Sequence, residues 1–301
     1  MPDSTGQALG PRQLSDSTKR AVAYPQPAPF PLALRAIYPI VHPMDIITSR
    51  QNALIKRCIK LHESRRERSK QAMTLLDGEH LIEAATAAGE PLERLLVSQT
   101  RAARGDYAAL LEKHAPIVSI IDDGLFGEMS DLESSTGLLG LWPIPASPAA
   151  IASGFVLALD GVQDPGNVGA ILRTASAVGV DQVWLGMGSA DPWSPKVLRA
   201  GMGAQFVVPV VERLPLSAAL TAFAGQIVVT SLEGSVPLYE ADLQGDLAMV
   251  LGSEGQGVSD EVLAAATLRI RIPMQPGIES LNVGAAAAVC LYERYRQSTA
   301  R

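Results

Sequence analysis

The sequence predicts an α/β protein: a mostly parallel sheet in the carboxyl-terminal half, preceded by a smaller α/β domain. Short apolar runs of strand length alternate with helical patterns along most of the chain, as in a sheet covered by helices on both faces. A chain of 301 residues is long enough for about two domains, and the Pro- and Ala-rich residues 143–154 read as the linker between them. A hydrophobic content of 47% with 19% charged residues is typical of globular proteins.

Composition disfavours several classes of protein. No apolar run approaches the roughly 18 residues of a membrane span and no signal-peptide pattern is present, so we expect a cytoplasmic protein without a membrane partner. The two cysteines, Cys58 and Cys290, are too far apart in sequence to indicate a disulfide framework or a metal site. All four histidines fall in the first 114 residues, so the carboxyl-terminal half has no histidine base and no histidine-rich zinc site. We expect no metal.

Residues 1–43 are rich in Pro, Ala, Ser and Gln and lack an amphipathic period, which predicts a disordered tail. The pattern becomes that of a folded chain after Met44. We therefore hypothesise that Met44 is the natural start. The intact mass of the endogenous protein tests this, because a mass beginning at Met1 would contradict it.

The smaller domain is expected over residues 44–142. Its pattern predicts helices at 52–68, 79–88, 106–114 and 123–129, and strands at 72–76, 92–98, 117–121 and 137–142. The stretch 50–70 is basic although the chain has a net charge of −6. Two interpretations fit, a solvated helix face and an electrostatic footprint for nucleic acid. The stretch contains two acidic residues, Glu63 and Glu67. Its eight basic residues are Arg50, Lys56, Arg57, Lys60, Arg65, Arg66, Arg68 and Lys70.

The larger domain is expected over residues 155–301. We predict strands at 155–159, 182–185, 206–211, 226–231, 247–251 and 268–272. Helices are predicted at 167–178, 194–202, 216–223 and 258–266, and a final Ala-rich helix runs from a cap at Ser280 to about residue 296.

The first of three loops in this domain that follow a strand spans residues 160–173. Its glycines allow a ligand to approach the backbone closely, and Asn167 is suited to cap the next helix. Arg173 lies within the first two turns of that helix and can direct a cation toward whatever the loop binds. A plain turn with an N-cap and a surface arginine explains the loop equally well.

The second loop spans residues 251–257, and its glycines follow the order G-x-x-G-x-G. This is neither the dinucleotide order nor a Walker loop, so the signal for a phosphate site is weak. Glu254 also places a carboxylate where a phosphate would lie, which favours a cationic ligand.

The third loop, residues 272–284, joins a strand that Pro273 ends to the final helix. Its two prolines and Gly277 constrain it, at a place where open α/β sheets bind ligands. The three loops together offer few charges, and no histidine, cysteine or metal set. That excludes most hydrolytic schemes and permits methyl transfer, where positioning a reactive cofactor supplies most of the catalysis.

These loops resemble the three motifs of the SPOUT RNA methyltransferases, within the ribose 2′-O-methyltransferases of the TrmH or SpoU family. The resemblance covers about 155–297 and lies in Asn167-x-Gly-x-x-x-Arg173, in Leu251-Gly-Ser-Glu-Gly-Gln-Gly257, and in Ile272-Pro-Met followed by Ser280-Leu-Asn-Val283. The first domain resembles, more loosely, the ribosomal-protein-like substrate-binding domain of such enzymes. One departure is Gly284, where many members have Ser.

The resemblance implies a deep trefoil knot, a homodimer, an RNA substrate and S-adenosylmethionine as cofactor. By motif position, the residues expected to hold the cofactor are Leu251, Gly252, Ile272, Met274 and Leu281. Those that fall on catalytic and substrate positions are Asn167, Arg173, Glu254, Ser280 and Asn282.

The expected reaction is methyl transfer to a ribose 2′-hydroxyl. Ribosomal RNA is favoured over tRNA as substrate because the first domain resembles those of rRNA-modifying members of the family. Because a guanidinium is a poor base, we expect Arg173 to bind a phosphate and stabilise a developing alkoxide, not to act as a base. A non-catalytic RNA-binding assembly factor is the alternative of another class. A dinucleotide-dependent enzyme is disfavoured by the glycine order.

Overall fold

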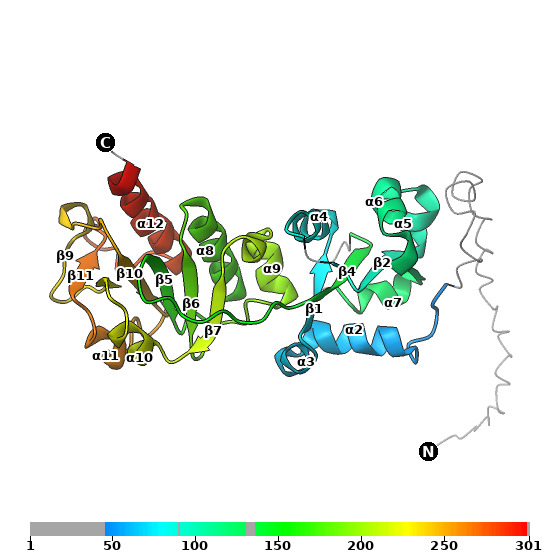
Figure 1. The fold of residues 1–301 in the computed structure, drawn as a ribbon, viewed down its shortest axis with the longest axis horizontal. Helices are drawn as coiled ribbons and strands as arrows, with labels where there is room; N and C mark the ends of the chain where they lie inside the picture. The colour runs from blue at the N-terminus through cyan, green and yellow to red at the C-terminus, as the bar shows by residue number, and fades with distance from the viewer. Residues whose placement is uncertain (1–45, 90, 131–135, 300–301) are drawn as a thin grey trace, which may run out of the picture.

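The computed structural model describes residues 46–89, 91–130 and 136–299 and has two sheets, one in each domain (Figure 1). The predicted tail at 1–43 and the proposed start at Met44 lie outside the described residues. Within them, no helix is long and apolar enough to cross a membrane.

The amino-terminal domain is built on a four-stranded sheet with the order β1-β4-β2-β3. The pairings β1–β4 and β4–β2 are antiparallel and β2–β3 is parallel. Helices α2 and α7 cover one face, and α4, α5 and α6 cover the other. The elements are α2 (Ala53–Glu63), α3 (Arg65–Gln71), β1 (Met73–Asp77), α4 (Glu79–Ala87), β2 (Arg94–Ser98), α5 (Gln99–Arg104), α6 (Ala108–Lys113), η1 (Ala115–Ile117), β3 (Val118–Ile121), α7 (Asp123–Gly127) and β4 (Leu138–Pro143).

The basic helix predicted at 52–68 is two helices. Ser64 adopts extended backbone angles between them, and its hydroxyl caps α3 by accepting a hydrogen bond from Glu67 N at 3.3 Å. A serine that bonds the backbone in this way favours a helix start over a helix interior. The break turns α3 away from α2, toward the second domain (Figure 1).

The carboxyl-terminal domain has a seven-stranded sheet with the order β7-β6-β5-β10-β8-β11-β9, in which every pairing is parallel. Its strands are β5 (Phe155–Asp160), β6 (Gln182–Gly186), β7 (Val210–Leu214), β8 (Gln226–Thr230), β9 (Val236–Pro237), β10 (Leu247–Gly252) and β11 (Leu268–Arg271). Its helices are α8 (Pro165–Ala177), α9 (Pro195–Gly201), η2 (Ala204–Phe206), α10 (Leu216–Thr221), η3 (Leu238–Glu240), α11 (Asp260–Leu263) and α12 (Val283–Thr299).

Alternating side chains of the strands build two cores in this domain. Leu157 and Leu159 of β5 face α8 and α12, whereas Val156 and Ala158 face α10 and α11. Both sets are buried, which explains why the strands read as continuous apolar runs. The predicted fold class is therefore confirmed. The deep trefoil knot agrees with this fold and stays a prediction of the family resemblance.

Four local predictions in this domain were wrong. Asp164, not Asn167, caps α8, because α8 begins at Pro165 and the Asp164 carboxylate accepts from Asn167 N at 2.7 Å. Asn282, not Ser280, precedes α12. The strand predicted at 206–211 starts at Val210, after the 3₁₀ turn η2, and the helix predicted at 258–266 is the short α11.

Candidate active site

The strand order brings the first two loops together. From β5 the chain moves outward to β6 and β7 and then crosses to β8, so the order reverses between β5 and β10. Open α/β sheets bind ligands at the carboxyl ends of strands beside such a reversal. Asp160 and Gly252, the last residues of β5 and β10, are paired in register there. The first loop starts at Asp160 and the second loop at the end of β10, beside Gly252.

Three side chains join the three loops through two hydrogen bonds. Asn282 Nδ2 donates to Asn167 Oδ1 at 2.9 Å, and Asn167 Nδ2 donates to Glu254 Oε1 at 2.7 Å. These residues are 115 and 87 positions apart in sequence. The carboxylate can only accept, so it fixes which end of each amide faces which partner.

Asn282 also fixes the start of α12. Its Oδ1 accepts from Gly284 N at 2.9 Å and from Ala285 N at 3.2 Å, which satisfies two backbone groups that the first helical turn leaves without a partner. One asparagine therefore caps the helix with its oxygen and holds Asn167 with its nitrogen. A side chain added at Gly284 would start 3.6 Å from Asn167 Oδ1, so the departure from Ser at this position lies directly beside the network.

Gly252 is required by the path of the second loop. Ser253 and Gly257 exchange two backbone hydrogen bonds of 2.9 and 3.0 Å, which folds the loop back over the end of β10. A Cβ at Gly252 would lie 2.0 Å from the carbonyl carbon of Gly257, so another residue cannot fit without opening the loop.

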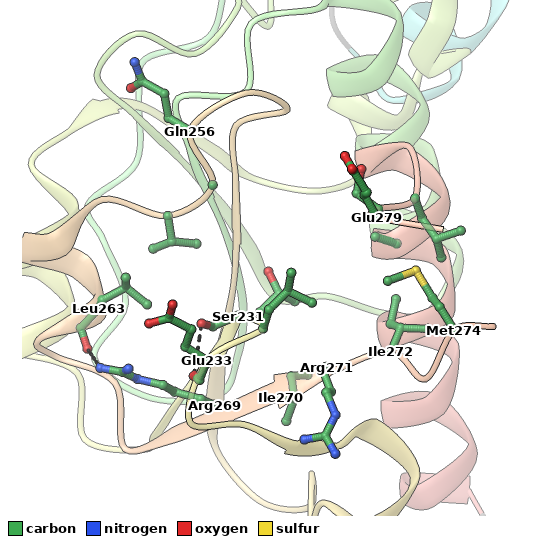
Figure 2. A pocket seen from close by; sticks show the side chains of 17 residues that line it. Ser231, Glu233, Gln256, Leu263, Arg269, Ile270, Arg271, Ile272, Met274 and Glu279 are labelled. Carbon is green, nitrogen blue, oxygen red and sulfur yellow. Dashed lines mark hydrogen bonds between the residues drawn. The ribbon is translucent and has the colours of Figure 1, made fainter. Parts of the chain in front are cut away.

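A pocket of about 420 Å³ lies beside this network, within the size range of small-molecule sites (Figure 2). Its wall combines the segment after β8, the second loop, β11 and the third loop. Of the predicted cofactor residues, Ile272, Met274 and Leu281 line it, as does Ser280. Leu251 is buried in the core and, like Gly252, is not among the lining residues.

Arg173 lies apart from the hydrogen-bonded network. Its side chain is exposed on α8, about two turns after the helix begins at Pro165, and within the described part of the chain it has no hydrogen bond or ion pair. The structure thus joins three of the five predicted catalytic residues, Asn167, Glu254 and Asn282, by hydrogen bonds. Ser280 lines the adjoining pocket. The guanidinium of Arg173 is left available to a ligand.

Sequence reasoning assigned no role to four charged residues of the pocket. Glu233 follows β8, Arg269 and Arg271 lie on β11, and Glu279 lies in the third loop. Arg269 donates to Leu263 O at 3.4 Å and Arg271 donates to Ser235 O, whereas the Glu233 carboxylate has no partner among the described residues. The signal that would have found Glu233 is its place in a loop directly after a parallel strand, like the three loops that were recognised.

The pocket fits S-adenosylmethionine in its chemistry. Apolar side chains and loop backbone make up most of the wall, which suits an adenine ring and a thioether chain, and the carboxylates of Glu233 and Glu279 suit a cationic cofactor. In the described residues no three His, Cys, Asp or Glu side chains are grouped as metal ligands would be.

Comparison with known proteins agrees with this geometry. Residues 154–292 match the model of the SpoU rRNA Methylase family, and residues 52–140 match that of the MRM3-like substrate binding domain. The chain is 33% identical to the 23S rRNA (guanosine(2553)-2′-O)-methyltransferase RlmP of Bacillus subtilis, over 83% of this chain and 98% of that protein. The chain belongs to the SpoU rRNA methylase family.

Further relatives of this family support the assignment. The 23S rRNA (guanosine-2′-O-)-methyltransferase RlmB of Coxiella burnetii is 36% identical, over 63% of this chain and 72% of that protein. The AdoMet-bound rRNA methyltransferase of Sinorhizobium meliloti superposes with a TM-score of 0.73 at 25% identity, covering 85% of this chain and 98% of that one. The sequence prediction is confirmed: this SpoU-family chain is an S-adenosylmethionine-dependent RNA ribose 2′-O-methyltransferase.

Proposed function

We propose that this SpoU-family enzyme methylates the ribose 2′-hydroxyl of a guanosine in the large ribosomal RNA. The observation that carries the proposal is the hydrogen-bonded chain Asn282–Asn167–Glu254 beside the pocket. Guanosine and the 23S RNA are named for the relatives from Bacillus subtilis and Coxiella burnetii. S-adenosylmethionine would supply an electrophilic sulfonium methyl group, and the protein's own residues supply position and charge.

We assign the substrate side to Arg173. An exposed guanidinium that has no partner among the described residues can bind a phosphate next to the target ribose and stabilise the oxygen as its proton leaves. A guanidinium is a poor base, so its contribution is electrostatic. Asn167 would hold the first loop in place for this role through its bond to Glu254.

The third loop would serve both ligands. Leu281, Ile272 and Met274 line the pocket and would hold the cofactor. Gly252 would allow the second loop to fold back over the end of β10. Ser280 lines the same pocket, and Asn282 is two residues further along. Ser280 and Asn282 would therefore orient the ribose between the pocket and the hydrogen-bonded residues Asn167 and Glu254. Glu254 is assigned as the tether of Asn167.

The exposed basic residues of the first domain would bind the RNA backbone. Of the basic stretch at 50–70, Arg50, Arg57, Arg65 and Arg68 are paired with carboxylates. Four others are exposed, namely Lys56, Lys60, Arg66 and Lys70. Lys56 and Lys60 line one groove with Arg50. Half of the eight cations are thus held by the protein's own carboxylates, and the exposed half are the ones we assign to RNA.

A homodimer is the assembly we propose. Tyr292 and Tyr295 of α12 are 53% and 43% exposed and pack edge to face at 6.2 Å, and such aromatic surface is typical of interfaces. Light scattering of the full chain tests this: the mass of two chains is expected, and the mass of one would contradict it.

Methyl transfer to defined RNAs tests the activity. The enzyme and S-adenosylmethionine with a labelled methyl group are incubated with transcripts of 23S rRNA, 16S rRNA and a tRNA pool, and the nucleosides are resolved by mass spectrometry. Label in 2′-O-methylguanosine from the 23S transcript is expected. Label confined to tRNA, or found on a base, would overturn the proposed substrate, and no label in any RNA would overturn the activity.

A further inference from the structure

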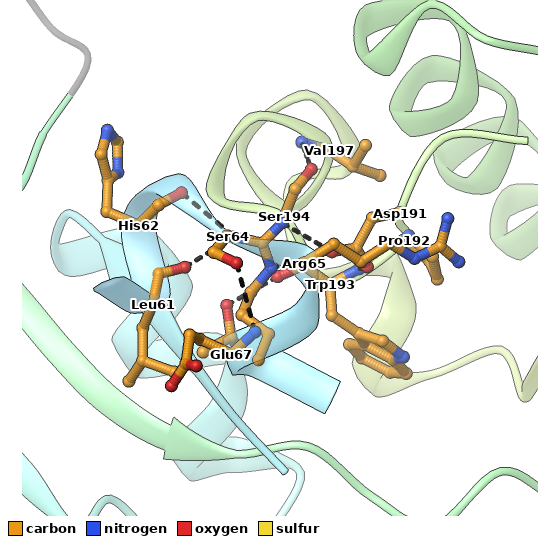
Figure 3. A network of polar contacts seen from close by, with 12 residues as sticks. Leu61, His62, Ser64, Arg65, Glu67, Asp191, Pro192, Trp193, Ser194 and Val197 are labelled. Carbon is orange, nitrogen blue, oxygen red and sulfur yellow. Dashed lines mark hydrogen bonds and ion pairs between the residues drawn. The ribbon is translucent and has the colours of Figure 1, made fainter. Parts of the chain in front are cut away.

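Two arginines of α3, Arg65 and Arg68, bind residues of the methyltransferase domain. Figure 3 shows this region, with Arg65 labelled on α3 and the segment 191–194 in the second domain. Arg68 donates from Nε to Asp191 Oδ2 at 2.8 Å, and its Nη2 lies 2.7 Å from the same oxygen. Arg65 donates from Nη2 to Glu212 Oε2 at 2.7 Å and from Nη1 to Ser189 O at 3.2 Å. Both arginines thus bind the segment 189–191 or the strand β7 beside it.

Arg68 is buried between the two domains and cannot contact RNA. It is 5% exposed, and its remaining nitrogen, Nη1, donates to the carbonyl oxygens of Leu61 and His62 at 2.6 and 3.0 Å. A buried ion pair adds little net stability, because desolvation offsets most of the attraction, but it holds its partners in one arrangement. The break at Ser64 is what aims Arg65 and Arg68 at the second domain.

The segment that these arginines bind is itself hydrogen-bonded to the first catalytic loop. Ala190 N donates to Val162 O at 2.9 Å, and the buried hydroxyl of Ser189 donates to Leu159 O at 3.1 Å. Val162 lies five residues before Asn167 in the same loop. A single residue, Ser189, therefore connects Arg65 of one domain to the end of β5 in the other.

The rest of the interface is packed as a protein core. Trp142 of β4 contacts Trp193 with ring centroids 5.9 Å apart, and Thr74 donates to Trp193 O at 2.6 Å. Trp193 and Leu198 belong to the same buried cluster as the helices of the amino-terminal domain. The interface leaves little freedom for one domain to turn against the other.

We propose that Arg65 and Arg68 are positioning residues for methyl transfer: they hold the RNA-binding domain in one orientation to the Asn167 loop. RNA held by Lys56 and Lys60 would then reach Arg173 at a fixed distance. This rests on the proposed function. It implies that loosening the interface lowers kcat on RNA while S-adenosylmethionine still binds, because the pocket receives no side chain from the interface.

A charge exchange across the interface tests the proposal. Glu212→Arg places two cations together, and Arg65→Glu combined with Glu212→Arg restores an ion pair of reversed polarity. The control is Glu240→Arg, because Glu240 is exposed on η3 and changes the net charge equally. We measure kcat and KM with the 23S transcript, the Kd of S-adenosylmethionine by calorimetry and the melting temperature.

Interdomain order is measured in the same variants. Nitroxide labels at Glu83→Cys and Gln244→Cys, both exposed sites, report the spread of distances between the domains by double electron–electron resonance. A residue that only contributed stability would lower the melting temperature without broadening that distance distribution in the folded state.

The expected result has three parts. Glu212→Arg lowers kcat at least about 10-fold, as misplacement far from the chemistry does, changes the cofactor Kd less than about twofold, and broadens the distances. The exchange variant recovers kcat to within about threefold, and Glu240→Arg behaves as wild type. Should Glu212→Arg not fold, Glu212→Gln is measured in the same way.

Two results would overturn the inference: a folded Glu212→Arg protein with wild-type kcat, or a loss that the exchange does not recover. An inactive wild-type protein would instead overturn the proposed function, so the two failures are distinguishable.

Discussion

Asn167 donates a hydrogen bond to Glu254 at 2.7 Å across 87 residues of sequence, and this bond joins the first catalytic loop to the second. The same Asn167 accepts from Asn282 of the third loop. The three loops are therefore held as one unit by side chains that could otherwise be taken for three separate surface positions.

Exchanging the donor and acceptor of the Asn167–Glu254 hydrogen bond tests whether this bond holds the first loop in place. Asn167→Asp sets two carboxylates against each other, and we expect kcat to fall about 10²-fold through displacement of the loop. In the double variant Asn167→Asp with Glu254→Gln, the glutamine donates to the aspartate, so kcat should recover most of that loss. Additive losses in the double-mutant cycle would mean that the two residues are not coupled, which would contradict the tether.

Gly252 should be the most restrictive position of the second loop. In Gly252→Ala the added Cβ meets the carbonyl carbon of Gly257, and we expect the cofactor Kd to rise at least about 10-fold and the stability to fall by about 1–3 kcal/mol. The matched control is Gly255→Ala, where the added Cβ meets nothing within 4 Å. Calorimetry and thermal melting of both variants measure the contrast. Equal behaviour of the two would contradict the account of this loop.

Both cysteines should be inert in the folded protein. Burial raises the pKa of the Cys58 thiol from 9.0 to about 12, and burial does the same for Cys290. At pH 8 about one thiol in 10⁴ is then ionised, so a disulfide reagent should react only after unfolding in guanidinium. Fast labelling of native protein would contradict this burial.

The same pKa shifts predict a pH dependence of stability. The folded protein holds these two protons more tightly than the unfolded chain, whose thiols ionise near pH 9. This contribution is complete below pH 9 and is lost as the pH rises toward about 12. Denaturant midpoints of wild type and of Cys58→Ala with Cys290→Ala should converge over that range.

The exposed lysines of α2 should carry part of the salt dependence of RNA binding. In Lys56→Ala with Lys60→Ala, the slope of log K against log salt should fall by about 2, because each lost phosphate contact removes about one unit. Lys113→Ala removes an exposed lysine from another helix and serves as the control. An unchanged slope in the double variant would place the RNA elsewhere.

Much of the fold could be predicted from local patterns, because buried parallel strands are continuous apolar runs bounded by turn residues. The order of the strands could not, since nothing local places β10 between β5 and β8. Helix starts were predicted least well. Ser280 and Asn282 are both good caps, and only the path of the chain selects Asn282.

The candidate site shows the same division. The three loops were recognisable from their residues, yet the bonds that join Asn167 to Glu254 and to Asn282 depend on tertiary structure. The basic stretch was ambiguous for a related reason. Whether an arginine binds RNA or an acid of the other domain, as Arg68 binds Asp191, depends on a partner more than 120 residues away.

Mapping 2′-O-methyl groups in cellular rRNA tests the central claim most directly. RNA from a strain lacking this gene is compared with RNA from the same strain carrying the wild-type gene or Arg173→Ala, and calorimetry confirms that the variant still binds S-adenosylmethionine. We predict that one guanosine of the large ribosomal RNA loses its methyl group in the deletion strain, regains it with wild type and stays unmodified with Arg173→Ala. An unchanged methylation map in the deletion strain, or full methylation with Arg173→Ala, would contradict the account.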